Sequence, residues 1–148
     1  MFIAKNNDLI ILAKETKEEL EQALQFMVYT SIEETDIDYQ LYGGEYLTLA
    51  EIELKERQRI DALTLTPADV ERALYAAKGM DFDDLKALIA EKIPQIDMKA
   101  LAIEFRAKDF YRGAMAGDIR LFDVVGALIG YTSEDMDYLF EHKQLPIS

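Results

Sequence analysis

The first part of the chain changes between strand-like and helix-like spacing of its apolar residues. Residues 2–12 are largely apolar on both sides of an Asn-Asn-Asp turn, which predicts a β-hairpin. Thr16 and Glu19 form a capping-box pair, so we expect a helix to begin there. This helix should be amphipathic, because apolar residues recur at helical spacing at Leu20, Ala23, Leu24 and Met27.

A second alternating stretch follows at residues 35–42. Apolar and polar residues take turns along it, as expected for a half-buried strand. Gly43-Gly44 then supplies a two-residue turn whose central positions need positive φ, and residues 45–47 return as a short strand. We therefore predict a small α+β module of the βαββ type over residues 1–47.

The next segment, residues 48–64, has the pattern of a highly charged helix. Thr48 and Glu51 form a second capping-box pair, and the apolar stripe behind it is narrow and interrupted by Glu56. A helix this polar usually connects two modules or lies against a partner. We therefore interpret residues 48–64 as a connecting helix.

Residues 65–148 contain five short segments with helical spacing, which predict a helical module. Each segment starts with a residue that caps helices well: Thr66 before Pro67, Asp81, Asp97, Asp118, and Thr132 or Ser133. The third segment is apolar on more than one face through Phe110 and Tyr111, so we expect a central helix there. The predicted fold class is α+β, mostly α.

Composition limits the classes of partner. The 148 residues include 29 acidic and 16 basic ones, a net charge of −13 that disfavours direct binding of nucleic acid or anionic membranes. No apolar run approaches the roughly 20 residues that a membrane-spanning helix needs. Cysteine is absent, which fits the cytoplasm.

Residues suited to catalysis are scarce. The chain has one histidine, His142, which we expect to face solvent near a helix end, and no nucleotide-binding or nucleophile motif. The acidic group Asp81, Asp83 and Asp84 is interpreted as a helix N-terminus rather than a cation site. We accordingly expect no enzyme activity, no catalytic residues, no cofactor and no bound metal.

The basic residues with aromatic neighbours lie late in the chain. They are Arg106, Lys108, Arg112 and Arg120, and nearby acidic residues dilute their charge. A nucleic-acid site needs a stronger local excess of positive charge. We therefore predict no such site here.

Tyrosine suggests where a partner binds. Four of the eight tyrosines, Tyr29, Tyr39, Tyr42 and Tyr46, lie around the second hairpin, and tyrosine is enriched at protein interfaces because it joins a large area to a polar tip. The alternative is that they are ordinary half-buried strand residues. Combined with the connecting helix, the candidate interface is Tyr39, Tyr42, Tyr46, Ile52 and Arg59.

Several segments resemble small uncharacterised proteins encoded in bacteriophage and prophage genomes, often near tail or late genes. In the first half these segments are ETKEELEQAL and IEETDIDYQLYGGEYLT. In the second half they are LTPADVERAL, KALAIEFRAKDFYRG and VVGALIGYTSEDMDYLF. The resemblance implies a phage-derived accessory protein and carries over no catalytic residue.

Three functional hypotheses follow. The first is a non-enzymatic phage or prophage accessory protein that acts through protein–protein interaction, for example in virion or tail assembly, with a phage or host protein or another copy of itself as partner. The second is an acidic inhibitor that mimics nucleic acid and blocks a host nucleic-acid-binding protein. The third is a carboxylate-based hydrolase.

Overall fold

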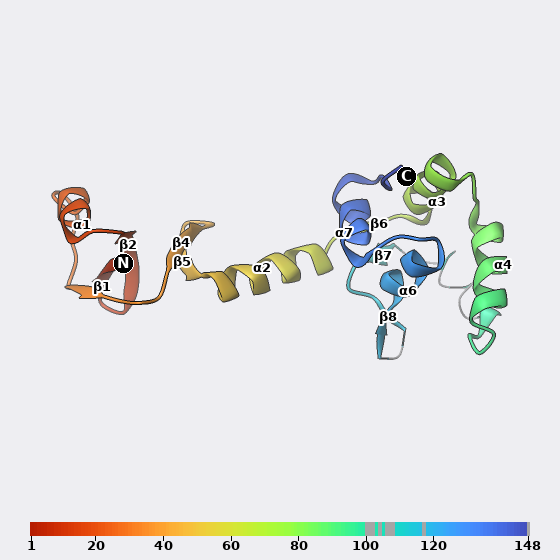
Figure 1. Cartoon of the computed structure of the whole chain (residues 1–148), viewed down its shortest axis with the longest axis horizontal. Coiled ribbons are helices and arrows are strands. Elements are labelled where there is room, and N and C mark those ends of the chain that lie inside the picture. Colours follow the sequence, from red (N-terminus) through yellow and green to blue (C-terminus); the bar gives the residue numbers. More distant parts are fainter. Residues whose placement is uncertain (100–102, 104, 106–108, 117, 148) are drawn as a thin grey trace. The chain divides into compact units, whose positions relative to one another are not determined.

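The computed structural model describes residues 1–99, 103, 105, 109–116 and 118–147. The chain divides into two compact units, Met1–Arg57 (unit 1) and Gln58–Ser148 (unit 2), and helix α2 (Leu49–Asp61) contains the boundary between them. Helices and small antiparallel sheets occur in both units, so the predicted α+β class is confirmed (Figure 1).

Unit 1 is built on a three-stranded antiparallel sheet. Strands β1 (Phe2–Asn6) and β2 (Leu9–Lys14) form the predicted first hairpin, and β3 (Ser31–Glu34) pairs with the other edge of β1. Helix α1 (Lys17–Ala23) begins at Thr16, whose side chain accepts a hydrogen bond from the Glu19 amide. The helix covers the sheet with Leu20 and Leu24, which pack with Ala4 in a small core.

Two predicted elements of unit 1 are shorter than expected. Helix α1 ends at Ala23, with Leu24 as its C-cap, so Met27 does not belong to the helix. Aromatic and β-branched residues dominate positions 26–30, and they have weak helix propensity. The expected strand at 35–42 is also broken, because the Thr35 hydroxyl accepts from the Ile37 amide in a local turn.

The second hairpin and the connecting helix form as predicted. Strands β4 (Tyr39–Tyr42) and β5 (Glu45–Thr48) pair through Gly43 and Gly44, whose φ angles are 57° and 83°. The Thr48 hydroxyl accepts from the Glu51 amide at 3.2 Å and caps α2. None of the residues of α2 is buried, which suits a helix that links two units.

Unit 2 contains helices α3 (Pro67–Lys78), α4 (Phe82–Lys92), α6 (Leu121–Leu128) and α7 (Ser133–His142) (Figure 1). Thr66, Asp81 and Thr132 are N-caps, each in a complete capping box. These caps confirm the predicted starts of three helices, and they explain the carboxylates near Asp81 as helix caps. His142 is exposed, as predicted, and is the last residue of α7.

A chain of phenylalanine rings crosses the core of unit 2. Successive ring centroids lie 4.8 to 5.6 Å apart along the series Phe82, Phe105, Phe110, Phe122 and Phe140. Three of the four contacts are edge-to-face, the arrangement that the aromatic quadrupole favours. Aliphatic residues from α3, α4, α6 and α7 complete this core.

The expected central helix after Asp97 does not extend as far as predicted. The Asp97 carboxylate accepts from the Lys99 amide, as a cap would, but Phe110–Tyr111 form strand β7 and pair with β6 (Thr64–Leu65). Part of the expected helix, including Leu101, Ala102, Arg106 and Lys108, lies outside the described residues.

The predicted cap at Asp118 is wrong. Asp118 lies in the tight turn between β8 (Met115–Ala116) and β9 (Ile119–Arg120). The N-cap of α6 is Arg120, which makes no side-chain capping bond. The short β8–β9 hairpin therefore places this helix start two residues later than the capping preference of Asp118 indicates.

Candidate interaction surface

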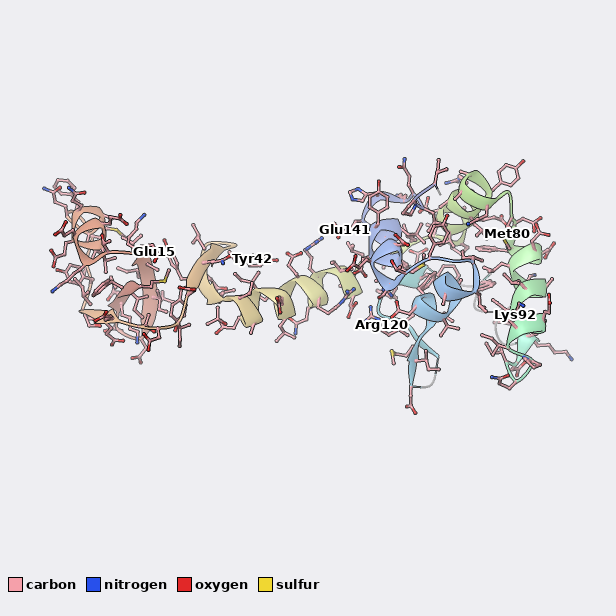
Figure 2. All side chains as sticks on the ribbon, viewed as in Figure 1. Glu15, Tyr42, Met80, Lys92, Arg120 and Glu141 are labelled. Carbon is pink, nitrogen blue, oxygen red and sulfur yellow. The ribbon has the colours of Figure 1, made fainter. Side chains whose placement is uncertain are left out.

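Four of the five candidate interface residues belong to unit 1. Tyr39, Tyr42 and Tyr46 are half-buried on the second hairpin, and Ile52 is half-buried on α2. Tyr42 is labelled in Figure 2. Its hydroxyl donates to Glu56 Oε1 on α2. Tyr42 therefore links the hairpin to the helix, and all three tyrosines keep part of their surface accessible.

An exposed ion pair joins the same two elements. Lys55 Nζ lies 2.8 Å from Glu45 Oε2. The hydrogen bond and the opposite charge of Lys55 lower the pKa of Glu45, and the same contact raises the pKa of Lys55. The hairpin is thus attached to α2 by polar contacts on the surface.

The fifth candidate residue, Arg59, lies in unit 2. Its guanidinium is 3.5 Å from the Glu141 carboxylate of α7. Arg59 therefore does not share a compact unit with the three tyrosines and Ile52.

The largest exposed apolar feature of unit 1 is a segment that the sequence patterns do not single out. Phe26, Met27, Val28 and Tyr29, which we call the apolar loop, are 94%, 44%, 79% and 44% exposed. Single exposed apolar residues are ordinary, but a contiguous group of large ones marks a binding surface or an aggregation hazard. The apolar loop is therefore the strongest candidate for a contact surface.

Both ends of the apolar loop are held by the fold. On one side Leu24 is 3% exposed, and its carbonyl accepts from the Met27 amide at 2.9 Å. On the other side the Thr30 amide and hydroxyl donate to the Lys5 carbonyl at 2.7 and 3.1 Å. The Asn7 amide in turn donates to the Thr30 hydroxyl at 2.9 Å. The loop is thus presented between two anchored ends.

The chain on either side of the apolar loop is strongly acidic. Residues 15–38 contain eight acidic residues and one basic residue, Lys17. Lys17 lies 3.9 Å from Glu21, and Lys5 of β1 lies 3.0 Å from Glu33. Glu18, Glu19 and Glu34 form no ion pair among the described residues. The segments before and after the apolar loop in the sequence therefore carry an excess of negative charge.

One signal in the sequence could have identified this loop. Helical spacing places Met27 on the inner face of a helix, but four large apolar residues in succession exceed what one helix face can bury. They follow the end of an amphipathic pattern and precede a strand with two glutamates. Such a run needs either a buried strand or a partner.

Unit 2 contains a buried ionic centre. Arg112 is 0% exposed, and its Nε and Nη2 lie 2.7 Å from Asp137 and Asp123, respectively. Nη2 also donates to the carbonyl and hydroxyl oxygens of Ser133. Arg112, treated in the sequence only as part of a diluted basic group, therefore fastens β7 to α6 and α7.

A second arginine extends this network. Arg120 (Figure 2) donates through Nη1 and Nη2 to the two carboxylate oxygens of Asp61, at 3.2 and 2.7 Å. Its Nε lies 3.5 Å from Asp123, the partner of Arg112. Bidentate pairing of this kind fixes geometry as well as charge. The two arginines are structural, and neither forms part of an exposed basic surface.

A hollow of about 360 Å³ on unit 2 bears on the hydrolase hypothesis, because its lining includes the carboxylates of Glu71 and Asp81. Glu71 accepts from the Phe82 amide at 2.9 Å, and Asp81 accepts from the Asp84 amide at 2.9 Å. Both carboxylates therefore cap the N-terminus of α4. Their hydrogen bonds account for their positions without a substrate.

The described residues contain no group of three or more histidine, cysteine, aspartate or glutamate residues placed to hold a metal ion. No helix among them is both long and apolar enough to cross a membrane. No protein family, curated protein or solved structure shows significant similarity to the chain.

Proposed function

We propose that the chain is a non-enzymatic accessory protein of phage or prophage origin that acts by binding another protein through unit 1. The observation that carries this proposal is the exposure of Phe26, Met27, Val28 and Tyr29 between two anchored ends. Full burial of one large apolar side chain contributes about 1.5–3 kcal/mol. Covering the apolar loop would therefore supply a substantial part of the free energy of a protein complex.

The hairpin and α2 offer further exposed apolar residues in unit 1. Leu41, Leu49 and Leu54 are 62%, 57% and 59% exposed, and Tyr39 and Tyr46 offer partly accessible rings. Aromatic and aliphatic residues with a polar border are the usual composition of an interface. The resemblance to phage proteins supports a role in virion or tail assembly, in the host cytoplasm or on the virion.

Site-specific photo-crosslinking in the host cell tests this function. A photoreactive residue replaces Phe26 in one variant and Tyr75, which is 67% exposed on unit 2, in a matched control. We expect one defined protein to be crosslinked at position 26 and not at position 75. The purified partner should then co-elute with the wild-type chain and not with the Phe26→Ser/Val28→Ser variant.

Two results would contradict the proposal. One is equal crosslinking at positions 26 and 75, which would indicate only random collision. The other is a purified partner that binds the wild type and the double variant with the same affinity, because the apolar loop would then contribute nothing.

The acidic stretch at residues 15–38 favours a second candidate, an inhibitor that occupies the nucleic-acid site of a host protein. Carboxylates can replace phosphates on a basic surface because both present negative oxygens to lysine and arginine. In this case the crosslinked partner should bind DNA or RNA, and the chain should displace the nucleic acid. If the partner binds the chain and its nucleic acid at the same time, this second candidate function is contradicted.

A further inference from the structure

Resting on the proposed function, we infer that the apolar loop inserts into an apolar pocket of the partner protein, and that lysine and arginine side chains surround this pocket. The inference assigns a chemical class to the partner from three features of unit 1. They are the order of exposed side chains along the loop, the two anchored ends, and the charge on both sides.

Exposure along the loop alternates. Phe26 and Val28 are 94% and 79% exposed, whereas Met27 and Tyr29 are each 44% exposed. Phe26 lies in the turn closed by the Met27 amide and the Leu24 carbonyl, and Val28 lies in the irregular segment after it, so these two side chains offer a partner the most surface. Phe26 and Val28 are therefore the two anchors that enter the pocket, with Met27 and Tyr29 contacting its border.

The anchored ends favour insertion of the loop in its present conformation. Leu24 is buried at one end, and Thr30 forms three hydrogen bonds with Lys5 and Asn7 at the other. Limiting the conformations of a free loop reduces the entropy lost on binding. A partner with a complementary pocket therefore needs to order few residues of unit 1.

Charge distinguishes between classes of partner. Unit 1 contains 13 acidic and 5 basic residues, and Glu18, Glu19 and Glu34, on the two elements that flank the loop in the sequence, form no ion pair among the described residues. A second copy would bring the same negative charge, and an anionic membrane would repel it. A basic protein surface gains from both the apolar contact and the carboxylates.

The absence of tryptophan from the natural chain allows a selective optical test. Phe26→Trp places the only tryptophan at the tip of the loop, and Tyr75→Trp on unit 2 is the matched control reporter. The probes are two synthetic amphipathic helices with the same leucine face. One has lysine and arginine on its polar face, and the other has glutamate.

We expect the basic helix to shift the tryptophan emission of the Phe26→Trp variant to shorter wavelength and to bind at least tenfold more tightly than the acidic helix. Affinity should fall as salt is raised from 50 to 500 mM, since the charged contacts are screened. Adding Val28→Ser should weaken binding at least tenfold. Adding Glu18→Gln and Glu34→Gln instead should reduce the preference for the basic helix. The Tyr75→Trp reporter should not respond.

The contrary outcomes separate this inference from the proposed function. Equal binding of both helices, lost on Val28→Ser, would overturn the basic pocket and leave protein binding by the loop intact. A blue shift of the tryptophan emission with phosphatidylcholine vesicles but with neither helix would indicate that the loop binds a lipid surface. A shift that grows with protein concentration alone would indicate that it binds a second copy of the chain. Either result overturns the inference. No response to any probe also overturns it, while crosslinking at position 26 independently decides the proposed function.

Discussion

The two units differ most in how much apolar surface they bury. Unit 1 has four buried apolar residues, Ile3, Ala4, Leu20 and Leu24, whereas the described part of unit 2 has fifteen. A compact unit of fewer than about 60 residues is only marginally stable with so small a core. Unit 1 also leaves four consecutive large apolar residues exposed. The comparison indicates that unit 2 is the more stable unit, and binding of the proposed partner would stabilise unit 1.

The ion pairs of the two units also differ in burial. Unit 1 is joined by exposed pairs such as Glu45–Lys55, which water and salt screen. Unit 2 contains Arg112, which is fully buried between two carboxylates. Loss of one member of a buried pair leaves an uncompensated charge, so the consequences of similar substitutions should differ greatly between the units.

The largest expected effect comes from Arg112→Ala. This change leaves Asp123 and Asp137 without their shared cation and should destabilise unit 2 by about 3–5 kcal/mol. Urea unfolding followed by hydrogen exchange and mass spectrometry measures each unit separately. Arg72→Ala, at a side chain that is 75% exposed, is the control and should have little effect. An equal loss of protection in unit 1 would show that the units do not unfold independently.

Leu20→Ala is the corresponding test of unit 1. Leu20 is 0% exposed and packs with Ala4 and Leu24. Truncating a buried leucine typically costs about 2–5 kcal/mol, which should unfold a unit with so small a core. Exchange should become fast across unit 1 and remain slow in unit 2. A matched Leu9→Ala change, at a side chain that is 65% exposed, should leave the exchange of both units unchanged.

A smaller effect on the stability of unit 2 should come from Asp69, in the first turn of α3, and it should depend on pH. The hydroxyl and backbone amide of Thr66 lower the pKa of Asp69, and the charges of Lys143 and Arg72 lower it further. The resulting stabilisation of unit 2 is complete above the ordinary aspartate pKa of about 3.9 and is lost as pH falls through the lowered folded-state pKa.

Asp69→Asn should therefore reduce the difference between the urea midpoints at pH 7 and pH 3. Asp83→Asn is the control, because the Asp83 side chain is 86% exposed. The same reduction in both variants would mean that the Asp69 cap is not the source of the pH dependence.

The smallest effect should follow Lys55→Ala in unit 1. Its partner Glu45 has a lowered pKa, but both groups are in contact with solvent. At physiological salt the urea midpoint should not change measurably, and any difference seen in low salt should disappear as salt is added. A clear change that persists in 1 M salt would show that the hairpin depends on this pair.

Sequence patterns predict the features that depend on near neighbours. The caps at Thr66, Asp81 and Thr132 and the Gly43-Gly44 turn form as expected, because each needs only residues within three or four positions. The predicted start of α6 is wrong, since pairing of β8 with β9 overrides the capping preference of Asp118.

The features that involve distant residues are not predictable in this way. Arg112 meets Asp137 across 25 positions, and Arg120 meets Asp61 across 59. No local pattern distinguishes such an arginine from a solvated one. The apolar loop escapes prediction for a different reason, because helical spacing places Met27 on the inner face of a helix that in fact ends at Ala23. The tyrosine interface remains a prediction.

Thr30 holds one end of the apolar loop without using any of the four exposed side chains. Its hydroxyl group bridges Lys5 and Asn7 at the base of the loop, and both of these hydrogen bonds are to backbone atoms rather than to the four displayed side chains. Valine has nearly the same shape but cannot form this bridge. The Thr30 hydroxyl therefore contributes two of the three hydrogen bonds that hold this end of the loop, and these two can change in evolution while the side chains offered to a partner stay the same.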